Sequence, residues 1–190
     1  MNLPNGCEAN APSVATKPVV SLQILVVFFC AKSFVLVVRL IVWTVGDAVA
    51  RMAQDFEVSP GVVWIGIGST TLLSCGSSIG LIRRVSWGWW CTAVFVSIDL
   101  LRSVMATADS IWNQQLHEPI TFFGWGGLRY KLEENYTFMF IYLAILALLF
   151  TQGLMTSLKV DSLPRYILAC VVVGLTYTWY LGMCLLAVWL

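Results

Sequence analysis

Long apolar runs separated by short polar connections dominate the chain. A helix that crosses a bilayer needs roughly 20 mostly apolar residues. Helix is the expected conformation, because an open sheet would leave backbone polar groups unpaired in lipid and the runs lack the alternation of barrel strands. The pattern predicts an all-α, polytopic transmembrane helical bundle with five spanning helices, at residues 19–45, 61–82, 87–108, 136–158 and 164–190.

The polar segments set the organisation of the chain. Residues 1–18 form a polar N-terminal tail that we expect to be mobile, and residues 19–190 form a single transmembrane bundle. Residues 46–60 are expected to include a short surface helix that extends the first span. Only four residues, 83–86, join the second and third spans, so these two spans must form an antiparallel hairpin. The longest connection, residues 109–135, is predicted to be an outer loop.

Composition narrows the class of protein. Hydrophobic residues make up 59% of the chain and charged residues 11%, whereas soluble domains contain about 45–50% and about 25%. Such a composition excludes a soluble enzyme, and a net charge of +1 excludes a nucleic-acid binder with a basic face. The expected environment is therefore the lipid bilayer, with no nucleic-acid partner.

The distribution of basic residues predicts the orientation. Cytoplasmic segments of membrane proteins carry an excess of Lys and Arg. With the N-terminus in the cytoplasm, five spans place the C-terminus on the opposite side. The short inner segments then carry Lys17, Arg83, Arg84, Lys159 and Arg165, while the longer outer segments carry Arg51, Arg129 and Lys131.

Four ionisable residues lie within the predicted spans: Lys32, Arg39, Asp99 and Arg102. Such residues are costly in hydrocarbon and usually pair inside a bundle. Lys32 is fourteen residues beyond Pro18, and Asp99 is twelve beyond Trp87. Both therefore lie roughly 18–21 Å along helices of the same direction, where they can form an ion pair. Asp99 can also pair with Arg102, three residues away, or all three can share one network. The network serves either packing, a proton or ion site, or a polar contact for a partner helix.

Small residues mark a helix-packing face on the second span. Side chains of this size let two helix backbones approach closely. The face packs either against the third or fourth span or against another subunit. Its members are Gly66, Thr70, Ser74, Gly76, Ser78 and Gly80.

The outer loop holds a further candidate contact, formed by Phe122, Phe123 and Trp125. A loop this apolar is expected to lie at the membrane interface or to fold back over the bundle. The six cysteines and the single histidine show no metal-ligand spacing, so we predict no metal and no cofactor.

These features favour a non-catalytic accessory or structural membrane subunit. It would act through helix–helix contacts with another membrane protein or with a second copy of itself. The alternative is a small transporter or an ion- or proton-conducting protein that uses Lys32, Asp99 and Arg102. A membrane-embedded enzyme is the third reading, but the sequence lacks paired carboxylates, a Ser–His or Cys–His pair and a metal motif.

Overall fold

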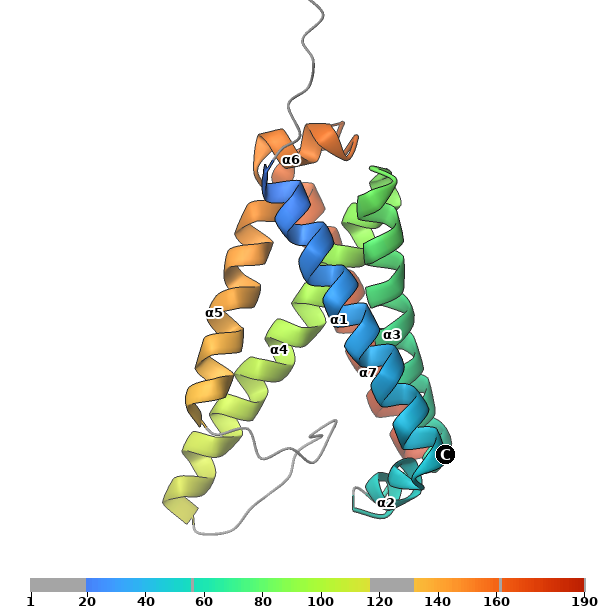
Figure 1. Cartoon of the computed structure of the whole chain (residues 1–190). Coiled ribbons are helices and arrows are strands. Elements are labelled where there is room, and N and C mark those ends of the chain that lie inside the picture. Colours follow the sequence, from blue (N-terminus) through green and yellow to red (C-terminus); the bar gives the residue numbers. More distant parts are fainter. Residues whose placement is uncertain (1–19, 56, 117–131, 161, 190) are drawn as a thin grey trace, which may run out of the picture.

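The computed structural model describes residues 20–55, 57–116, 132–160 and 162–189, and this part of the chain is helical without a strand (Figure 1). The all-α class predicted from the sequence is confirmed. Seven helices follow one another along the described chain: α1 (Val20–Val45), α2 (Ala48–Asp55), α3 (Pro60–Ile82), α4 (Ser86–Leu116), α5 (Leu132–Leu149), α6 (Gln152–Ser157) and α7 (Arg165–Trp189).

The five long helices alternate in direction along the bundle. α3 packs against α1 and α4, α4 packs in turn against α5 and α7, and α7 also touches α3. The α3–α4 connection and α6 lie at one end of the molecule, hereafter the α6 end (Figure 1). α2 and the C-terminal end of α7 lie at the other, hereafter the α2 end.

Three helices, α1, α3 and α7, have the length and the apolar composition to cross a membrane, and α5 contains a shorter apolar segment, Tyr136–Leu149. In α1, only 17% of the most apolar 18-residue stretch is buried within the chain, and the value for α7 is the same. Val27, Phe34 and Val173 are among the side chains that these two helices expose. Because so much apolar surface is unfavourable in water, these outer faces indicate a membrane protein.

The α3–α4 hairpin brings two glycines into direct contact. A Cβ atom on Gly80 would overlap the backbone of Gly88, and a Cβ atom on Gly88 would overlap that of Gly80. Arg84 closes the turn in the left-handed region, with φ 52°. The N–H of Val85 then donates to the carbonyl of Gly80 at 3.1 Å, as in a Schellman cap. The predicted antiparallel hairpin is confirmed.

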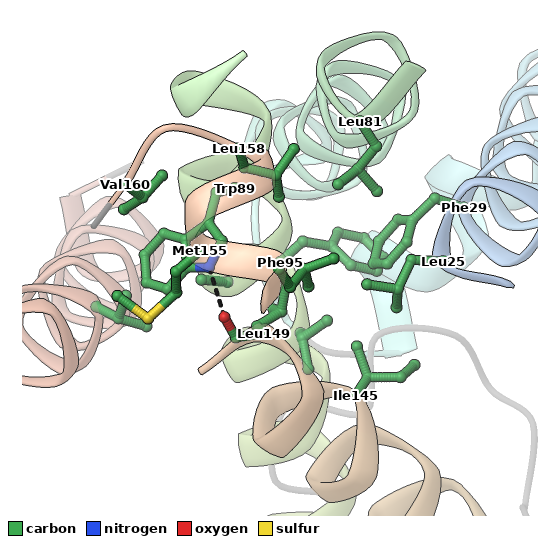
Figure 2. Packing of buried hydrophobic residues seen from close by; sticks show 14 of the residues in the cluster. Leu25, Phe29, Leu81, Trp89, Phe95, Ile145, Leu149, Met155, Leu158 and Val160 are labelled. Carbon is green, nitrogen blue, oxygen red and sulfur yellow. Dashed lines mark hydrogen bonds between the residues drawn. The ribbon is translucent and has the colours of Figure 1, made fainter. Parts of the chain in front are cut away.

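A cluster of buried apolar side chains fills the α6 end of the bundle (Figure 2). Trp89 and Phe95 of α4 lie at its centre, with Phe29 of α1 against Phe95 at 5.7 Å between ring centroids. The α6 segment contributes Leu154 and Met155, which are both buried. α6 thus covers the end of the core instead of continuing α5.

The single span predicted over residues 136–158 is wrong, because α5 ends at Leu149 and α6 begins at Gln152. Trp89 Nε1 donates to the carbonyl of Leu149 at 2.9 Å, so an indole takes the place of a helical N–H at this position (Figure 2). Thr151 donates its hydroxyl to the carbonyl of Leu148 at 2.7 Å, which further stabilises the break.

Two other boundaries differ from the sequence-based prediction. The short helix in residues 46–60 is present as α2, but Asp47 adopts φ 51° and separates it from α1, so α2 does not extend the first span. α4 continues to Leu116, well past the predicted end at residue 108. The predicted tail, residues 1–18, and most of the predicted outer loop, residues 117–131, lie outside the described residues.

Candidate functional site

Lys32 of α1 and Asp99 of α4 form an ion pair inside the bundle. Lys32 Nζ lies 3.2 Å from Asp99 Oδ2, and the side chain of Asp99 is only 8% exposed. The two residues lie at similar distances along helices of the same direction, which is why counting along the sequence predicts their contact. The pair joins two helices that both pack along α3.

Tyr142 of α5 completes the pair, and our sequence reasoning missed it. Lys32 Nζ donates to Tyr142 Oη at 2.8 Å, and Tyr142 Oη donates to Asp99 Oδ2 at 2.9 Å. The three polar atoms therefore form a closed triangle across α1, α4 and α5. Counting residues along the fourth predicted span can reveal this tyrosine, since Tyr142 lies six residues beyond the start of that span.

Arg102 takes the other oxygen of the same carboxylate. Its Nη1 lies 3.4 Å from Asp99 Oδ1, three residues away on α4, and its side chain is 32% exposed. Both of the arrangements predicted for Asp99 are therefore present together. One carboxylate serves two cations, so each of its oxygens accepts from at least one donor. This accounts for the tolerance of a buried carboxylate at this position.

Arg39 does not belong to this network, contrary to the sequence-based prediction. It lies seven residues beyond Lys32 on α1, about 10 Å further toward the α2 end. Its guanidinium lies over the indole ring of Trp43, 4.9 Å from the ring centroid. This cation–π contact suits a cation that extends toward the end of a spanning helix.

A small cavity of about 40 Å³ opens beside Arg39 among α1, α3, α4 and α7. Arg102 lines the same cavity, so it connects this space with the Asp99 network. Thr70 contributes a hydroxyl that already donates to the carbonyls of Gly66 and Ile67 at 3.0 Å. The described residues that line it are Leu36, Arg39, Trp43, Ile67, Thr70, Arg102 and Trp179.

The small residues predicted as one packing face on α3 occupy two faces. Ser74 and Ser78 meet Ser33 of α1, at 2.9 Å and 2.7 Å between hydroxyl oxygens. Gly76 and Gly80 point instead toward α4. Residues two positions apart on a helix are separated by about 200° of rotation, so the serines and the glycines cannot share a partner.

Gly66 and Thr70 are the two remaining members of the predicted face. Gly66 is buried, and Thr70 lies at the cavity, on the half of α3 nearer the α2 end. The small residues therefore pack α3 against other helices of the same chain. These are α1 and α4, of which α4 corresponds to the predicted third span. Ser33 is a contact that the sequence reasoning missed, although a hydroxyl beside Lys32 in an apolar run is a visible signal.

The remaining predicted contact, Phe122, Phe123 and Trp125, lies outside the described residues. Within the described part of the chain, no group of three or more His, Cys, Asp or Glu side chains is placed to hold a metal ion. The network itself consists of one carboxylate, one phenol and two cations.

Comparison with protein-family models, with curated proteins and with solved structures finds no match to this chain. Two features of the described residues bear on its function: the triangle of Lys32, Asp99 and Tyr142, and the cavity shared by Arg39 and Arg102.

Proposed function

We propose that the chain crosses the membrane five times, through α1, α3, α4, α5 and α7. α4 packs along α3 on one side and along α5 and α7 on others, so its first part lies at the same depth as the apolar helices. The segment 86–107 is about 33 Å long and α5 about 27 Å, close to the roughly 30 Å of a hydrocarbon core. Pairing of Asp99 with Lys32 and Arg102 supports the placement of α4 in lipid.

The orientation that fits best has the N-terminus in the cytoplasm and the C-terminus on the opposite side. The α6 end then faces the cytoplasm (Figure 1). Arg83, Arg84, Lys159 and Arg165 all lie in or next to the short connections at that end. Only Arg51 of the described basic residues lies on α2, at the other end, as the positive-inside rule favours.

The proposed role is that of a non-catalytic accessory or structural subunit that works through helix–helix contacts. The observation that carries this proposal is an open small-residue face on α7. Gly174 and Gly182 would each meet nothing within 4 Å if a Cβ were added, and Thr178 between them is exposed. Gly174 lies opposite the buried side of α7, where Val172 and Met183 pack into the bundle, and the partly exposed Gly182 lies beside that side.

Spacing by four residues at Gly174, Thr178 and Gly182 is typical of transmembrane helices that pack closely on one another. On α3, comparable glycines are covered by α4 of the same chain. The corresponding α7 face has no such cover within the described residues. A helix from another membrane protein, or from a second copy of this chain, suits it in size and polarity.

The test is extraction of the full chain in a mild detergent, followed by mass analysis of the intact complexes. Gly174→Leu and Gly182→Leu fill the face and are expected to release the companion or to convert a dimer into a monomer. Val173→Leu is the matched control, because Val173 is exposed on the same helix but about 100° away from Gly174. A chain that stays monomeric and without companion in the wild type contradicts the proposal.

A second candidate function is ion or proton transport through Lys32, Asp99 and Arg102. The observation that favours it is that Arg102 both pairs with Asp99 and lines the cavity. Asp99→Asn distinguishes the two functions in reconstituted vesicles. If the protein is a transporter, Asp99→Asn should abolish a pH- or ion-dependent flux while the protein still inserts. If it is an accessory subunit, Asp99→Asn should weaken assembly, and the wild type should show no flux.

A further inference from the structure

The α6 end of the bundle carries four exposed cations (Figure 1). Arg83 and Arg84 lie in the α3–α4 connection, Lys159 follows α6, and Arg165 is the first residue of α7. None of the four pairs with a carboxylate in the part of the chain that the structure describes. We call these four residues the α6-end cations. Because their charges are not neutralised by described side chains, they are available to an external partner.

Charge is distributed unevenly among the connections of the bundle. The two connections at the α6 end, residues 83–86 and 150–165, contain four cations and a single carboxylate, Asp161. The other two connections with their flanking helix ends, residues 46–59 and 109–135, contain three cations and seven carboxylates. The net charge is therefore +3 for the first pair of segments and −4 for the second pair. A surface with an excess of cations attracts an anionic partner.

Two of the α6-end cations occupy backbone positions that favour glycine. Arg84 and Lys159 adopt φ values of 52° and 57°. Arg84 closes the Schellman cap of α3, and the same cap follows α6, where the N–H of Val160 donates to the carbonyl of Met155 at 2.9 Å. A residue with a Cβ is less stable than glycine in this left-handed conformation. Two helices therefore end on a cation at a position where glycine would be more favourable, which points to a use for the charge.

The dipole of the helix does not account for these cations. A cation near the C-terminus of a helix interacts favourably with the dipole. Glu57, however, occupies the same kind of cap after α2, with φ 52° and the N–H of Val58 donating to the carbonyl of Ala53 at 3.0 Å. The dipole would favour a cation there too, yet the residue is an acid. The sign of the charge at the cap thus follows the end of the molecule and not the helix dipole.

Exposed aromatic side chains beside the cations select the kind of anionic partner. Trp87 follows the arginine pair on α4, and Tyr166 follows Arg165 on α7; both rings are exposed. Trp and Tyr favour the boundary between lipid headgroups and acyl chains. An acidic soluble protein would contact the cations but would leave these rings in water, whereas a membrane surface accommodates both. The combination therefore favours a lipid surface.

We propose that the α6-end cations bind the phosphate groups of anionic lipids in the folded protein. The guanidinium groups of Arg83, Arg84 and Arg165 match phosphate oxygens with two parallel N–H groups, and Lys159 adds a compact charge. Binding to the folded bundle goes beyond the role of such cations in setting orientation during insertion. The proposal rests on the proposed placement of the bundle in the membrane, and it is independent of the α7 face.

The experiment measures lipid binding to the full chain in a non-ionic detergent by native mass spectrometry. Phosphatidylglycerol is the anionic probe and phosphatidylcholine the zwitterionic one, and the wild type is expected to bind phosphatidylglycerol more tightly. The double variant Arg84→Gly/Lys159→Gly removes two charges and should weaken phosphatidylglycerol binding by about tenfold or more, since each cation near an anionic surface contributes about fivefold. Phosphatidylcholine binding should stay within about twofold.

Glycine at these two positions separates binding from stability. Because glycine adopts positive φ without strain, the double variant should unfold in denaturing detergent no more easily than the wild type. Glu57→Gly is the matched control, with the same change of backbone at the opposite end, and should leave phosphatidylglycerol binding within about twofold. Arg83→Gln is a second variant, at a residue with φ −79°, and should weaken binding by about fivefold.

Three results would overturn the proposal. The first is equal binding of the two lipids by the wild type. The second is a double variant that loses stability but keeps its preference for phosphatidylglycerol, because the cations would then serve only the helix ends. The third is tighter binding of polyglutamate than of phosphatidylglycerol, which would assign the surface to an acidic protein. Alkali-resistant incorporation of the wild type into phosphatidylcholine vesicles tests the membrane placement separately, so its failure is distinguishable from a missing lipid preference.

Discussion

Gly80 and Gly88 lie face to face at the start of the α3–α4 hairpin, so close that neither position has room for a side chain. The contact fixes the angle at which α4 leaves α3. It also places Trp89, the next residue of α4, in the buried core. The position of the Asp99 network therefore depends on two glycines at the far end of the same helix pair.

Gly80→Ala is expected to destabilise the bundle by about 1–3 kcal/mol, the usual cost of overpacking, because the added methyl group would have to displace the α4 backbone. Unfolding by a denaturing detergent in mixed micelles measures this loss. Gly68→Ala is the control on the same helix, since a Cβ there meets nothing within 4 Å. Equal stability of the Gly80→Ala protein and the wild type would show that the hairpin is looser than described.

The polar parts of the site are easiest to anticipate where a residue carries a charge. Lys32 and Asp99 are conspicuous in apolar runs, and counting along two helices places them at one depth. Tyr142 carries no charge and resembles any aromatic residue of a spanning helix. Its role depends on which face of α5 meets α4, and the apolar composition of α5 conceals that face.

The Tyr142 hydroxyl is expected to contribute measurably to stability, because it bridges Lys32 and Asp99. Tyr142→Phe should lower the free energy of unfolding by about 0.6–1.7 kcal/mol, the range for hydrogen bonds between membrane helices. Tyr166→Phe is the control, as this tyrosine is 70% exposed. The two variants are compared in the same mixed-micelle titration, and equal stability would remove Tyr142 from the network.

The break between α5 and α6 lies beyond what the pattern of apolar residues can predict. Residues 136–158 are apolar enough to read as one helix, and the structure ends that helix with an indole from α4. A tertiary hydrogen bond of this kind leaves no periodic pattern in the sequence. In the same way, the small residues of α3 are visible in the sequence, but their division between α1 and α4 follows only from the packing.

Trp89→Phe tests the tertiary hydrogen bond that ends α5. The substitution leaves the buried carbonyl of Leu149 without its indole donor, which should cost about 1–3 kcal/mol. Hydrogen exchange at Leu154 and Met155 is expected to accelerate, because α6 loses its anchor. Trp64→Phe, on an indole that is 37% exposed, should change neither quantity. An unchanged exchange rate in Trp89→Phe would mean that packing alone holds α6.

Lys32 and Asp99 hold α1 and α4 together as a pair of charges inside the bundle, and the rest of the account depends on this claim. The most direct test is a double-mutant cycle of Lys32→Met and Asp99→Asn, measured by unfolding in lipid bicelles. Each single change removes one charge of the pair, although Asp99 keeps Arg102 in Lys32→Met, and should cost about 3–5 kcal/mol. The double variant should lose less than the sum of the two, by about 1–3 kcal/mol. Strict additivity of the two losses would contradict the claim.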